Sequence, residues 1–538
     1  MKLLLISLQS NANLTGLKYI AANALASGHD SLILLLPGYL EKDMSPAIED
    51  FIRDYNPDLI GISLMSIEFY PAKNFTRLIR EKFKTPIIWG GIHVIIQPEE
   101  CLKYADYVCY GEGERTVVSL LDHLRDKGRD VLPEIPNIWV KPVRNDVSNG
   151  VNDKVRILKR PEAPPEMDLD SLPPQEYLPD YYYVYHKDKI YNFAKNPHLF
   201  HKYALYSGTC HMLITTRGCS LYCGYCANSF LMNVYGKKVR ARSVKNVMEE
   251  LKEVRKDPHV IYINIEDDCF FIHSREWMRK FRDEYKKHID LPFIVRVIPT
   301  TLDREKLFIL KEAGLSWVIM GIQSGSDRVN FDIYNRKIHF SSVMAAAELL
   351  SKAKVAPSYE MIVDNPYETE ETEMETVNAM AKLNRPYVIS LAHLTFFPGT
   401  PLAERATKDN IVDPEAYLST YPCNIDKTYL NKLLFMTPYI PRFIIKYLNR
   451  PAASRRPIHS LLTNCLSFIV KRTIEPAMYF FVTTRSLGYS IKLTSRTVFG
   501  NWRSALIKWL SNYLDKGDYE YHQRLLKARK TMPELFDK

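Results

Sequence analysis

Cysteine is scarce in this sequence. Nine cysteines are spread over 538 residues, too few for a disulfide scaffold, and their odd number argues against complete pairing. Three of the nine fall within eight residues, at Cys219, Cys223 and Cys226. We therefore expect a reducing compartment, the cytoplasm, and a local chemical use for the three clustered thiols.

Long apolar runs are also absent. No segment has 18 or more uninterrupted apolar residues, so we predict no membrane-spanning helix. The opening run Met1–Ile6 is short, is followed at once by polar residues and has no evident cleavage site. It therefore predicts a β-strand rather than a signal peptide. An apolar fraction of 46% and a charged fraction of 25% are ordinary for a globular protein, and the length suggests about three domains.

Acidic residues are nearly missing from one part of the chain. Between Asn424 and Leu510, fourteen Lys and Arg accompany two acids, although the whole chain carries a net charge of only +10. The C-terminal part is therefore predicted to have its own partner. Its aromatic and aliphatic residues favour peripheral contact with an anionic membrane or an acidic ligand. A solvated helical cap is an equally simple interpretation, and nucleic acid is the least favoured partner.

Residues 1–130 alternate short apolar runs with amphipathic ones. Apolar strands that alternate with helices predict a doubly wound, Rossmann-like parallel sheet, which binds ligands at the carboxyl ends of its strands. The predicted strands are Leu3–Leu8, Leu32–Leu36, Leu59–Leu64, Ile87–Trp89 and Tyr107–Tyr110, and the predicted helices are Leu17–Ala26, Ile48–Tyr55, Phe75–Phe83 and Pro98–Tyr104.

The rest of the chain divides into three further regions. Residues 131–207 are rich in Pro, Asp, Asn and Tyr and are predicted to form an irregular linker with short strands. Residues 208–425 predict a partial (β/α)6 barrel with its chemistry at the strand C-termini, and residues 426–538 predict a mainly α-helical, basic domain. The six barrel strands are expected at His211–Thr216, Val260–Glu266, Phe293–Val297, Trp317–Ile322, Ala356–Val363 and Val388–Phe397.

The strongest local signal is the C-x3-C-x2-C spacing of Cys219, Cys223 and Cys226, directly after a predicted strand. Three thiolates on one short loop can bind three irons of a cubane cluster, which leaves the fourth iron without a ligand from the motif. That open iron can be chelated by S-adenosylmethionine (SAM). A zinc site with Cys210 as the fourth ligand, or three unrelated buried cysteines, are the alternatives.

This segment resembles the cluster loop of the radical SAM enzymes. Tyr225, just before the third cysteine, fits the family pattern, in which that aromatic residue lies beside the adenine of SAM. The resemblance implies that Cys219, Cys223 and Cys226 bind a [4Fe–4S] cluster. It also implies that electron transfer into bound SAM yields a 5′-deoxyadenosyl radical.

Later residues fit the same family and imply further contacts with SAM. Glu266 and Asp267 end a predicted strand, where the family has acids that hold the methionine amino group; helix capping by Asp267 is the alternative. Gln323 and Ser324 lie in a segment that resembles the family's G-[IV]-E-S-G, with Gln323 in place of Glu. Arg296 is predicted to bind the SAM carboxylate, or else to form a buried ion pair.

The N-terminal region resembles the cobalamin-binding domain that precedes many radical SAM enzymes. Small residues at strand ends let a long nucleotide tail approach the backbone closely, and no Asp-x-His-x-x-Gly is present. The resemblance therefore implies base-off cobalamin without a histidine ligand from that motif, and a sheet that binds something else is the alternative. The implied cobalamin-binding residues are Gly61, Ser63, Leu64, Ser66, Gly90, Gly91, His93, Gly111, Glu112 and Gly113.

Together these resemblances cover residues 1–425 and indicate a class B, cobalamin-binding radical SAM enzyme. The family's commonest reaction is methylation of an unactivated carbon by way of the 5′-deoxyadenosyl radical and methylcobalamin. Ring formation, rearrangement or C–C coupling, with a lipid among the candidate substrates, is one alternative, and a non-catalytic cobalamin or cluster sensor is another. The expected partners are a small-molecule or lipid substrate, an electron donor such as flavodoxin or ferredoxin, and a membrane at the basic C-terminal region.

Overall fold

The structure is a computed structural model that describes residues 1–141, 157–412, 425, 427–475, 524 and 527–533. These residues form two compact units. The first contains residues 1–208 with 524 and 527–533, and the second contains residues 209–412 with 425 and 427–475. Within the described ranges, every helix is too short or too polar to cross a bilayer.

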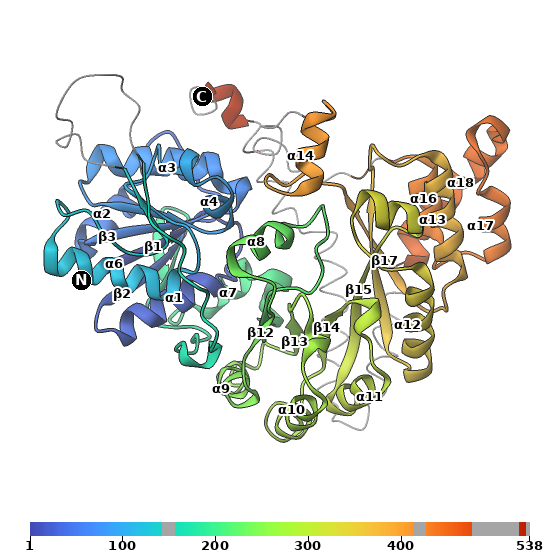
Figure 1. The fold of residues 1–538 in the computed structure, drawn as a ribbon, viewed down its shortest axis with the longest axis horizontal. Coiled ribbons are helices and arrows are strands. Elements are labelled where there is room, and N and C mark those ends of the chain that lie inside the picture. The colour runs from blue at the N-terminus through green and yellow to red at the C-terminus, as the bar shows by residue number, and fades with distance from the viewer. Residues whose placement is uncertain (142–156, 413–424, 426, 476–523, 525–526, 534–538) are drawn as a thin grey trace. The chain divides into compact units, whose positions relative to one another are not determined.

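The first unit is built on a nine-stranded sheet (Figure 1). At its centre, five parallel strands run in the order β2-β1-β3-β4-β5. This is a doubly wound order in which β1 and β3 flank the point where the chain reverses direction across the sheet. These strands are β1 (Lys2–Ser7), β2 (Asp30–Leu35), β3 (Leu59–Ser63), β4 (Ile87–Gly90) and β5 (Tyr107–Cys109).

The segment predicted as a linker contributes four short strands to the same sheet. Strands β6 (Ile138–Val140) and β7 (Leu158–Lys159) extend it antiparallel beyond β5. At the other edge, β8 (Tyr182–His186) pairs parallel with β2, and β9 (Lys189–Asn192) returns antiparallel to β8. Each of these strands has only two to five residues, too few for a clear apolar period in the sequence.

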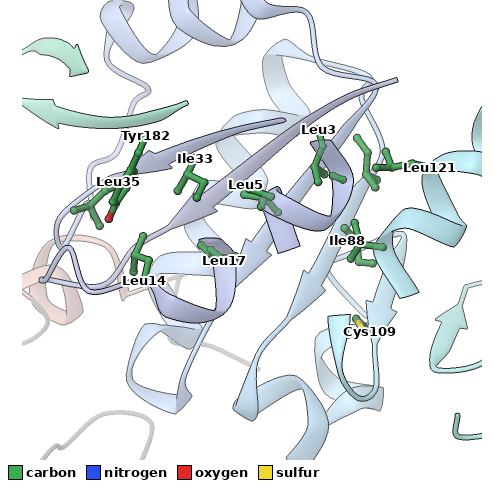
Figure 2. Close-up of a cluster of buried hydrophobic side chains, with 14 of the residues drawn as sticks. Leu3, Leu5, Leu14, Leu17, Ile33, Leu35, Ile88, Cys109, Leu121 and Tyr182 are labelled. Atoms are coloured by element: carbon green, nitrogen blue, oxygen red, sulfur yellow. The ribbon is translucent and has the colours of Figure 1, made fainter. Parts of the chain in front are cut away.

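Helices cover both faces of the central strands because successive side chains point to opposite faces. Leu3 and Leu5 of β1 belong to a cluster that includes Leu17 and Leu121 (Figure 2). Leu4 lies in the cluster on the other face. The helices on the first face are α1 (Thr15–Ala26), α6 (Gly113–Lys127) and α7 (Pro197–Tyr203); those on the second are α2 (Pro46–Tyr55), α3 (Phe69–Lys82), α4 (Ile92–Ile96) and α5 (Pro98–Cys101).

The second unit contains a six-stranded parallel sheet whose strands are ordered as they occur in the chain. Such a sequential parallel sheet is an open (β/α) barrel, with all its carboxyl ends at one edge. Its strands are β10 (Cys210–Leu213), β13 (Tyr262–Ile265), β14 (Phe293–Val297), β15 (Leu315–Gln323), β16 (Ala356–Val363) and β17 (Val388–His393).

Helices connect these strands, and their ends are fixed by local capping. Ser243, Ser274, Asp303 and Thr369 each accept a hydrogen bond from a backbone N–H in the first turn of the helix that follows, which stabilises that helix start by about 1 kcal/mol. The helices are α8 (Ala227–Tyr235), α9 (Val244–Val254), α10 (Arg275–His288), α11 (Arg304–Ala313), α12 (Phe340–Ala353), α13 (Glu370–Lys382) and α14 (Pro401–Lys408).

A buried ionic network fixes the first barrel strand to α9. The carboxylate of Glu250 lies 2.7 Å from His211 Nε2 on β10 and 2.7 Å from Arg242 Nη1. Burial alone would raise the pKa of Glu250, but Arg242 and His211 hold it at about 2. Removing one member of such a network would leave a buried charge without compensation.

The described part of the basic C-terminal region is helical and belongs to the second unit. It comprises α16 (Tyr429–Met436), α17 (Arg442–Leu448), α18 (Pro457–Ile469) and the π-helical turn η9 (Val470–Ile474). α16 packs on α13, and α17 and α18 lie beside it at the edge of the unit (Figure 1). The predicted fold class is confirmed, while the predicted domain boundaries at 130, 207 and 425 stay predictions.

Candidate functional site

The cysteine loop lies between the short strand β11 (Thr216–Arg217) and α8. Other segments of the second unit hold it from two sides. Gly224 N donates to Tyr334 O at 2.7 Å, Leu402 N donates to Gly224 O at 2.8 Å, and Asn335 Nδ2 donates to Tyr222 O at 3.0 Å. The loop conformation is therefore set by residues more than 100 positions away.

The three predicted cluster ligands are free thiols with low to moderate exposure. Burial raises the pKa of Cys219 to about 12 and that of Cys226 to about 11, and the Cys223 thiol adds to both shifts. Because only thiolates bind iron, such a loop needs positive charge at the sulfur atoms, which the irons of a cluster provide.

The donor set suits a cluster rather than a single ion. Among the described residues, no three Cys, His, Asp or Glu side chains are grouped to hold one metal ion. A cubane does not need such a group, because each of its cysteines binds a different iron. Cys210, the predicted fourth ligand of a zinc site, is buried on β10 with its thiol 3.8 Å from Met212 Sδ.

Arg336 places a positive charge beside this loop. Its side chain is buried, with Nη1 3.6 Å from Cys223 Sγ and Nη2 donating to Gly321 O at 2.7 Å. A guanidinium remains charged at all physiological pH values. Arg336 therefore places its charge beside the Cys223 sulfur and links the cysteine loop to the end of β15.

Glu266 and Arg296 are paired with each other. They stand at the carboxyl ends of the adjacent strands β13 and β14, and Glu266 Oε2 forms an ion pair with Arg296 Nη1. Asn264 Nδ2 donates to Glu266 Oε1 at 2.6 Å. On β16, burial raises the pKa of Glu360, and Arg296 opposes that shift. The barrel thus holds a group of carboxylates around one guanidinium at its carboxyl edge.

Asp267 has a different position. Its Oδ1 accepts hydrogen bonds from Thr215 N at 2.6 Å and Thr216 N at 3.1 Å, and its Oδ2 accepts from the Thr215 hydroxyl. The side chain is 1% exposed, and burial raises its pKa to about 6. The Asp267 carboxyl fixes the backbone between β10 and the cysteine loop. This structural role differs from the contact with SAM that the sequence predicts.

Gln323 and Ser324 end β15 at an irregular point. The pairing with β16 shifts between Gly321 and Gln323, and Gln323 has φ +72°. Left-handed backbone at a residue other than glycine is often found at functional sites. Ser324 is buried and hydrogen bonds with Thr376 Oγ1 at 3.0 Å, while Tyr225 of the cysteine loop packs edge-on against Tyr334, with ring centroids 5.1 Å apart.

In the first unit, the predicted cobalamin-binding residues lie at the carboxyl ends of three adjacent parallel strands, β3, β4 and β5. Leu64 N donates to Gly90 O at 3.0 Å, and His93 N donates to Leu64 O at 3.3 Å. Gly91 has φ +97°, and a Cβ there would lie 2.6 Å from Leu64 O. The loops after β3 and β4 are thus held together, and Gly91 makes their close approach possible.

His93 is buried between these loops. Its ring is 1% exposed, its Nδ1 lies 3.0 Å from Ser66 Oγ, and burial lowers its pKa to about 4. Within the described part of the chain, its Nε2 has no hydrogen-bond partner. A buried polar atom of this kind fits a ligand that brings its own polar groups, as the amide-rich rim of cobalamin would.

The remaining predicted residues surround the same edge. Ser63 Oγ is 3.1 Å from the position of a Cβ at Gly91. A Cβ at Gly61 would lie 2.9 Å from Leu5, and one at Gly113 would lie 2.9 Å from Ile20, so both glycines serve packing of the sheet. The turn between β5 and α6 contains Gly111 with φ +148° and Glu112, whose Oε2 accepts from Glu166 N at 2.9 Å.

Sequence reasoning missed two polar residues of the barrel edge, Arg336 and Glu360; a third polar residue there is Glu368. Burial raises the pKa of Glu368 to about 8, Glu373 adds to that shift, and its Oε1 lies 3.5 Å from Ser324 Oγ. Neither Arg336 nor Glu360 belongs to the motifs that identified the site, and Arg336 is 113 positions from Cys223. Only the folded barrel brings them to the predicted residues.

Comparison with known proteins agrees with this architecture. The family model of the B12 binding domain matches residues 1–121, and that of the radical SAM superfamily matches residues 213–380. An uncharacterized methyltransferase of Pyrococcus horikoshii is 25% identical over 403 residues, which are 74% of this chain and 79% of that protein.

Two solved structures share the fold. The radical SAM methyltransferase TsrM from Kitasatospora setae, with cobalamin and a [4Fe–4S] cluster bound, aligns with a TM-score of 0.57 and 18% identity over 76% of this chain and 75% of its own. The cobalamin-dependent SAM radical enzyme OxsB aligns with a TM-score of 0.64 and 13% identity over 98% and 84%.

The chain therefore has the domain organisation of a cobalamin-binding radical SAM enzyme, with a B12 binding domain followed by a radical SAM domain. The two family models cover the N-terminal sheet and the barrel in the predicted order. The predicted family and its cofactor set, a [4Fe–4S] cluster, SAM and cobalamin, are confirmed, while the individual residue roles stay predictions.

Proposed function

We propose that this protein is a cobalamin-dependent radical SAM methyltransferase that methylates an unactivated carbon of a small molecule or lipid. The observation that carries the proposal is the presence of a B12 binding domain and a radical SAM domain in one chain. The Pyrococcus horikoshii relative and TsrM are both named as methyltransferases. That favours methylation over ring formation, rearrangement, C–C coupling or a sensor without turnover.

When bound, the cluster and SAM would supply a hydrogen-abstracting radical, and cobalamin would supply a methyl carrier. Cys219, Cys223 and Cys226 would hold the cluster, and Arg336 would place a positive charge beside Cys223. Glu266, as an acceptor at the end of β13, would hold the amino group of SAM.

The other predicted SAM contacts follow from the same edge of the barrel. Arg296 would bind the SAM carboxylate while remaining close to Glu266, since one guanidinium has five N–H donors. Gln323 and Ser324 would offer neutral hydrogen bonds where the family has a Glu. Tyr225 would lie beside the adenine.

In the first unit, the loops after β3, β4 and β5 would form the cobalamin edge. His93 Nε2 would hydrogen bond with a polar group of cobalamin, because burial lowers its pKa and keeps the ring neutral. Its Nδ1 is already engaged by Ser66, which fixes the ring orientation. Gly91 would keep the loops close enough to form one surface.

Two partners complete the proposal. Reductive cleavage of SAM needs one electron per event, so a low-potential carrier such as flavodoxin or ferredoxin would supply it. The basic C-terminal region would bring the enzyme to a membrane.

Anaerobic reconstitution followed by product analysis tests the function. We expect about four irons and one cobalt per chain, the content of one cubane and one corrin. With a reductant and a cell extract of small molecules and lipids, both 5′-deoxyadenosine and S-adenosylhomocysteine should form, with labelled methyl entering one compound. C219A should lose iron and both products, while C210A, its matched control, should keep them.

The alternatives give different results. 5′-Deoxyadenosine without S-adenosylhomocysteine would indicate a non-methylating radical reaction. Neither product from a fully loaded protein would indicate a sensor, and zinc in place of iron would overturn the cluster assignment.

A further inference from the structure

Helix α18 turns its apolar side outward. Its exposed apolar residues recur at intervals of three and four and so form one stripe along the helix; they are Ile458, Leu461, Leu462, Phe468 and Ile469. Their exposed fractions run from 39% for Leu462 to 61% for Phe468. The opposite side buries the polar residues His459 and Thr463, the reverse of the pattern of a helix on a water-exposed protein surface.

Helix α17 extends this surface. Phe443 is 74% exposed and Tyr447 is 48% exposed. Lys446 lies on the same side at helical spacing, and Arg450, just after the helix, lies over the Tyr447 ring. The rings of Tyr447 and His459 meet with centroids 5.3 Å apart, so the two helices are in contact. Together, the exposed sides of α17, α18 and η9 form what we call the α17–α18 face.

The charge around this face has one sign. Residues 427–474 contain nine Lys and Arg and no Asp or Glu, and one of the nine, Arg455, is paired with Glu370 of α13. Two of the cations lie over exposed rings of the same face: Arg472 is 4.7 Å from the Phe468 ring centroid and Arg450 is 5.2 Å from that of Tyr447. Cationic heads beside exposed aromatic and aliphatic groups suit the boundary between lipid headgroups and acyl chains.

We propose that the α17–α18 face binds the surface of an anionic lipid bilayer. The apolar stripe of α18 enters the headgroup boundary, and the surrounding Lys and Arg contact lipid phosphates. An acidic protein would need only the cations, whereas the stripe also requires an apolar partner. Residues 476–510 of the same chain contain five Lys and Arg and no acid, so their charge does not complement that of the face.

Flotation of the full-length protein with vesicles tests this proposal without using turnover. We expect the protein to float with vesicles of phosphatidylglycerol and phosphatidylcholine, but not with phosphatidylcholine alone, and binding should weaken as salt is raised. Failure to bind the anionic vesicles would overturn the proposal. Because binding is measured directly, a failure of the proposed methyltransferase activity would leave this result unaffected.

Matched variants assign the binding to the face. Each cation removed near an anionic membrane lowers the partition coefficient about fivefold, so K471E/R472E should lower it by at least about 25-fold. K286E/K287E on α10 makes the same charge change at exposed positions of the same unit and should have a much smaller effect. L461S/F468S should also abolish binding, while I272S/F308S, at exposed apolar residues elsewhere in the unit, should not. Equal losses in a variant and its control would refute the assignment.

The alkylation rate of Cys465 reports what covers the apolar stripe of α18. Among the described cysteines it is the one exposed thiol, and it lies within the apolar stripe at the spacing of Leu461 and Leu462. We expect mass spectrometry to show rapid alkylation of Cys465 in the free protein and slow alkylation with anionic vesicles. Slow alkylation without vesicles, at any protein concentration, would mean that residues 476–523 cover the face. Slowing as the protein concentration rises would mean that a second copy does, and either result would overturn the proposal.

Discussion

Substitution of Asp267 separates two roles for this carboxylate. In the structure it receives two backbone N–H groups and the Thr215 hydroxyl, whereas the sequence predicts that it holds the amino group of SAM. D267A removes every acceptor. D267N keeps an oxygen for both N–H groups, and its NH2 can donate to Thr215 Oγ1, whose own proton can turn to His273 Nε2 at 2.8 Å.

The magnitudes follow from these contacts. Thr215 and Thr216 are 0% and 3% exposed, so D267A leaves two buried N–H groups unpaired at about 1–3 kcal/mol each. The total loss of unfolding free energy should be about 3–5 kcal/mol, including the lost hydroxyl contact. D267N changes only a donor for an acceptor within a satisfied network, and it should lose less than about 1.5 kcal/mol.

Denaturant unfolding of the apoprotein and iron analysis after reconstitution measure both effects. We expect D267A to be destabilised and to bind iron poorly, because the strand that leads into the cysteine loop is released. D267N should resemble the wild type in stability, iron content and affinity for SAM. Loss of SAM affinity in D267N at unchanged stability would refute the positioning role and support the contact predicted from the sequence.

Three further changes test other parts of the molecule. G91A should lower both the stability of the first unit and cobalamin affinity, measured by thermal shift with cobalamin, whereas G28A meets open space at φ +80° and should show only the left-handed cost of about 1–2 kcal/mol. E250Q should lose about 3–5 kcal/mol in denaturant unfolding, against less than about 0.5 kcal/mol for the exposed neighbour E249Q. Burial raises the pKa of Glu368 to about 8. The stability that its neutral form contributes is therefore fully present below the ordinary carboxyl pKa and is lost as the pH rises through 8. E368Q should flatten the pH dependence of the melting temperature between about pH 5 and 9.

Much of the fold could be predicted because buried parallel strands have a simple signature. The strand expected at Ala356–Val363 is β16 residue for residue, and Phe293–Val297 is β14. The first six residues of α3, starting at Phe69, were not predicted, because Pro71 is typical of a break but is tolerated in the first turn of a helix. Short strands were expected in the linker, but the positions of β6 to β9 and their place in the first sheet were not, because pairing with an existing sheet, rather than an apolar pattern, makes them strands.

The candidate site also has a part that the sequence predicts and a part that it does not. Local motifs were sufficient to find the cysteine loop and the glycine-containing loops after β3, β4 and β5, since each lies in one short stretch of sequence. They could not find Arg336, which lies beside Cys223 only because a π-helical turn at Val329–Ile333 precedes it and Tyr334 O receives Gly224 N. The position of a positive charge beside the thiols depends on the folded barrel, so the cysteine motif alone does not predict it.

Glu266 and Asp267 show why a sequence motif alone cannot tell which of two adjacent residues has which role. Both carboxylates end the same strand, but every buried backbone N–H needs an acceptor, and Thr215 and Thr216 take theirs from Asp267. Glu266 is engaged by the side chains of Asn264 and Arg296, which can turn toward a ligand without breaking the backbone of the barrel. Because a cofactor can compete with side chains at much lower cost than with a buried strand, we expect Glu266 to be the carboxylate that contacts SAM and Asp267 to set the position of the cysteine loop.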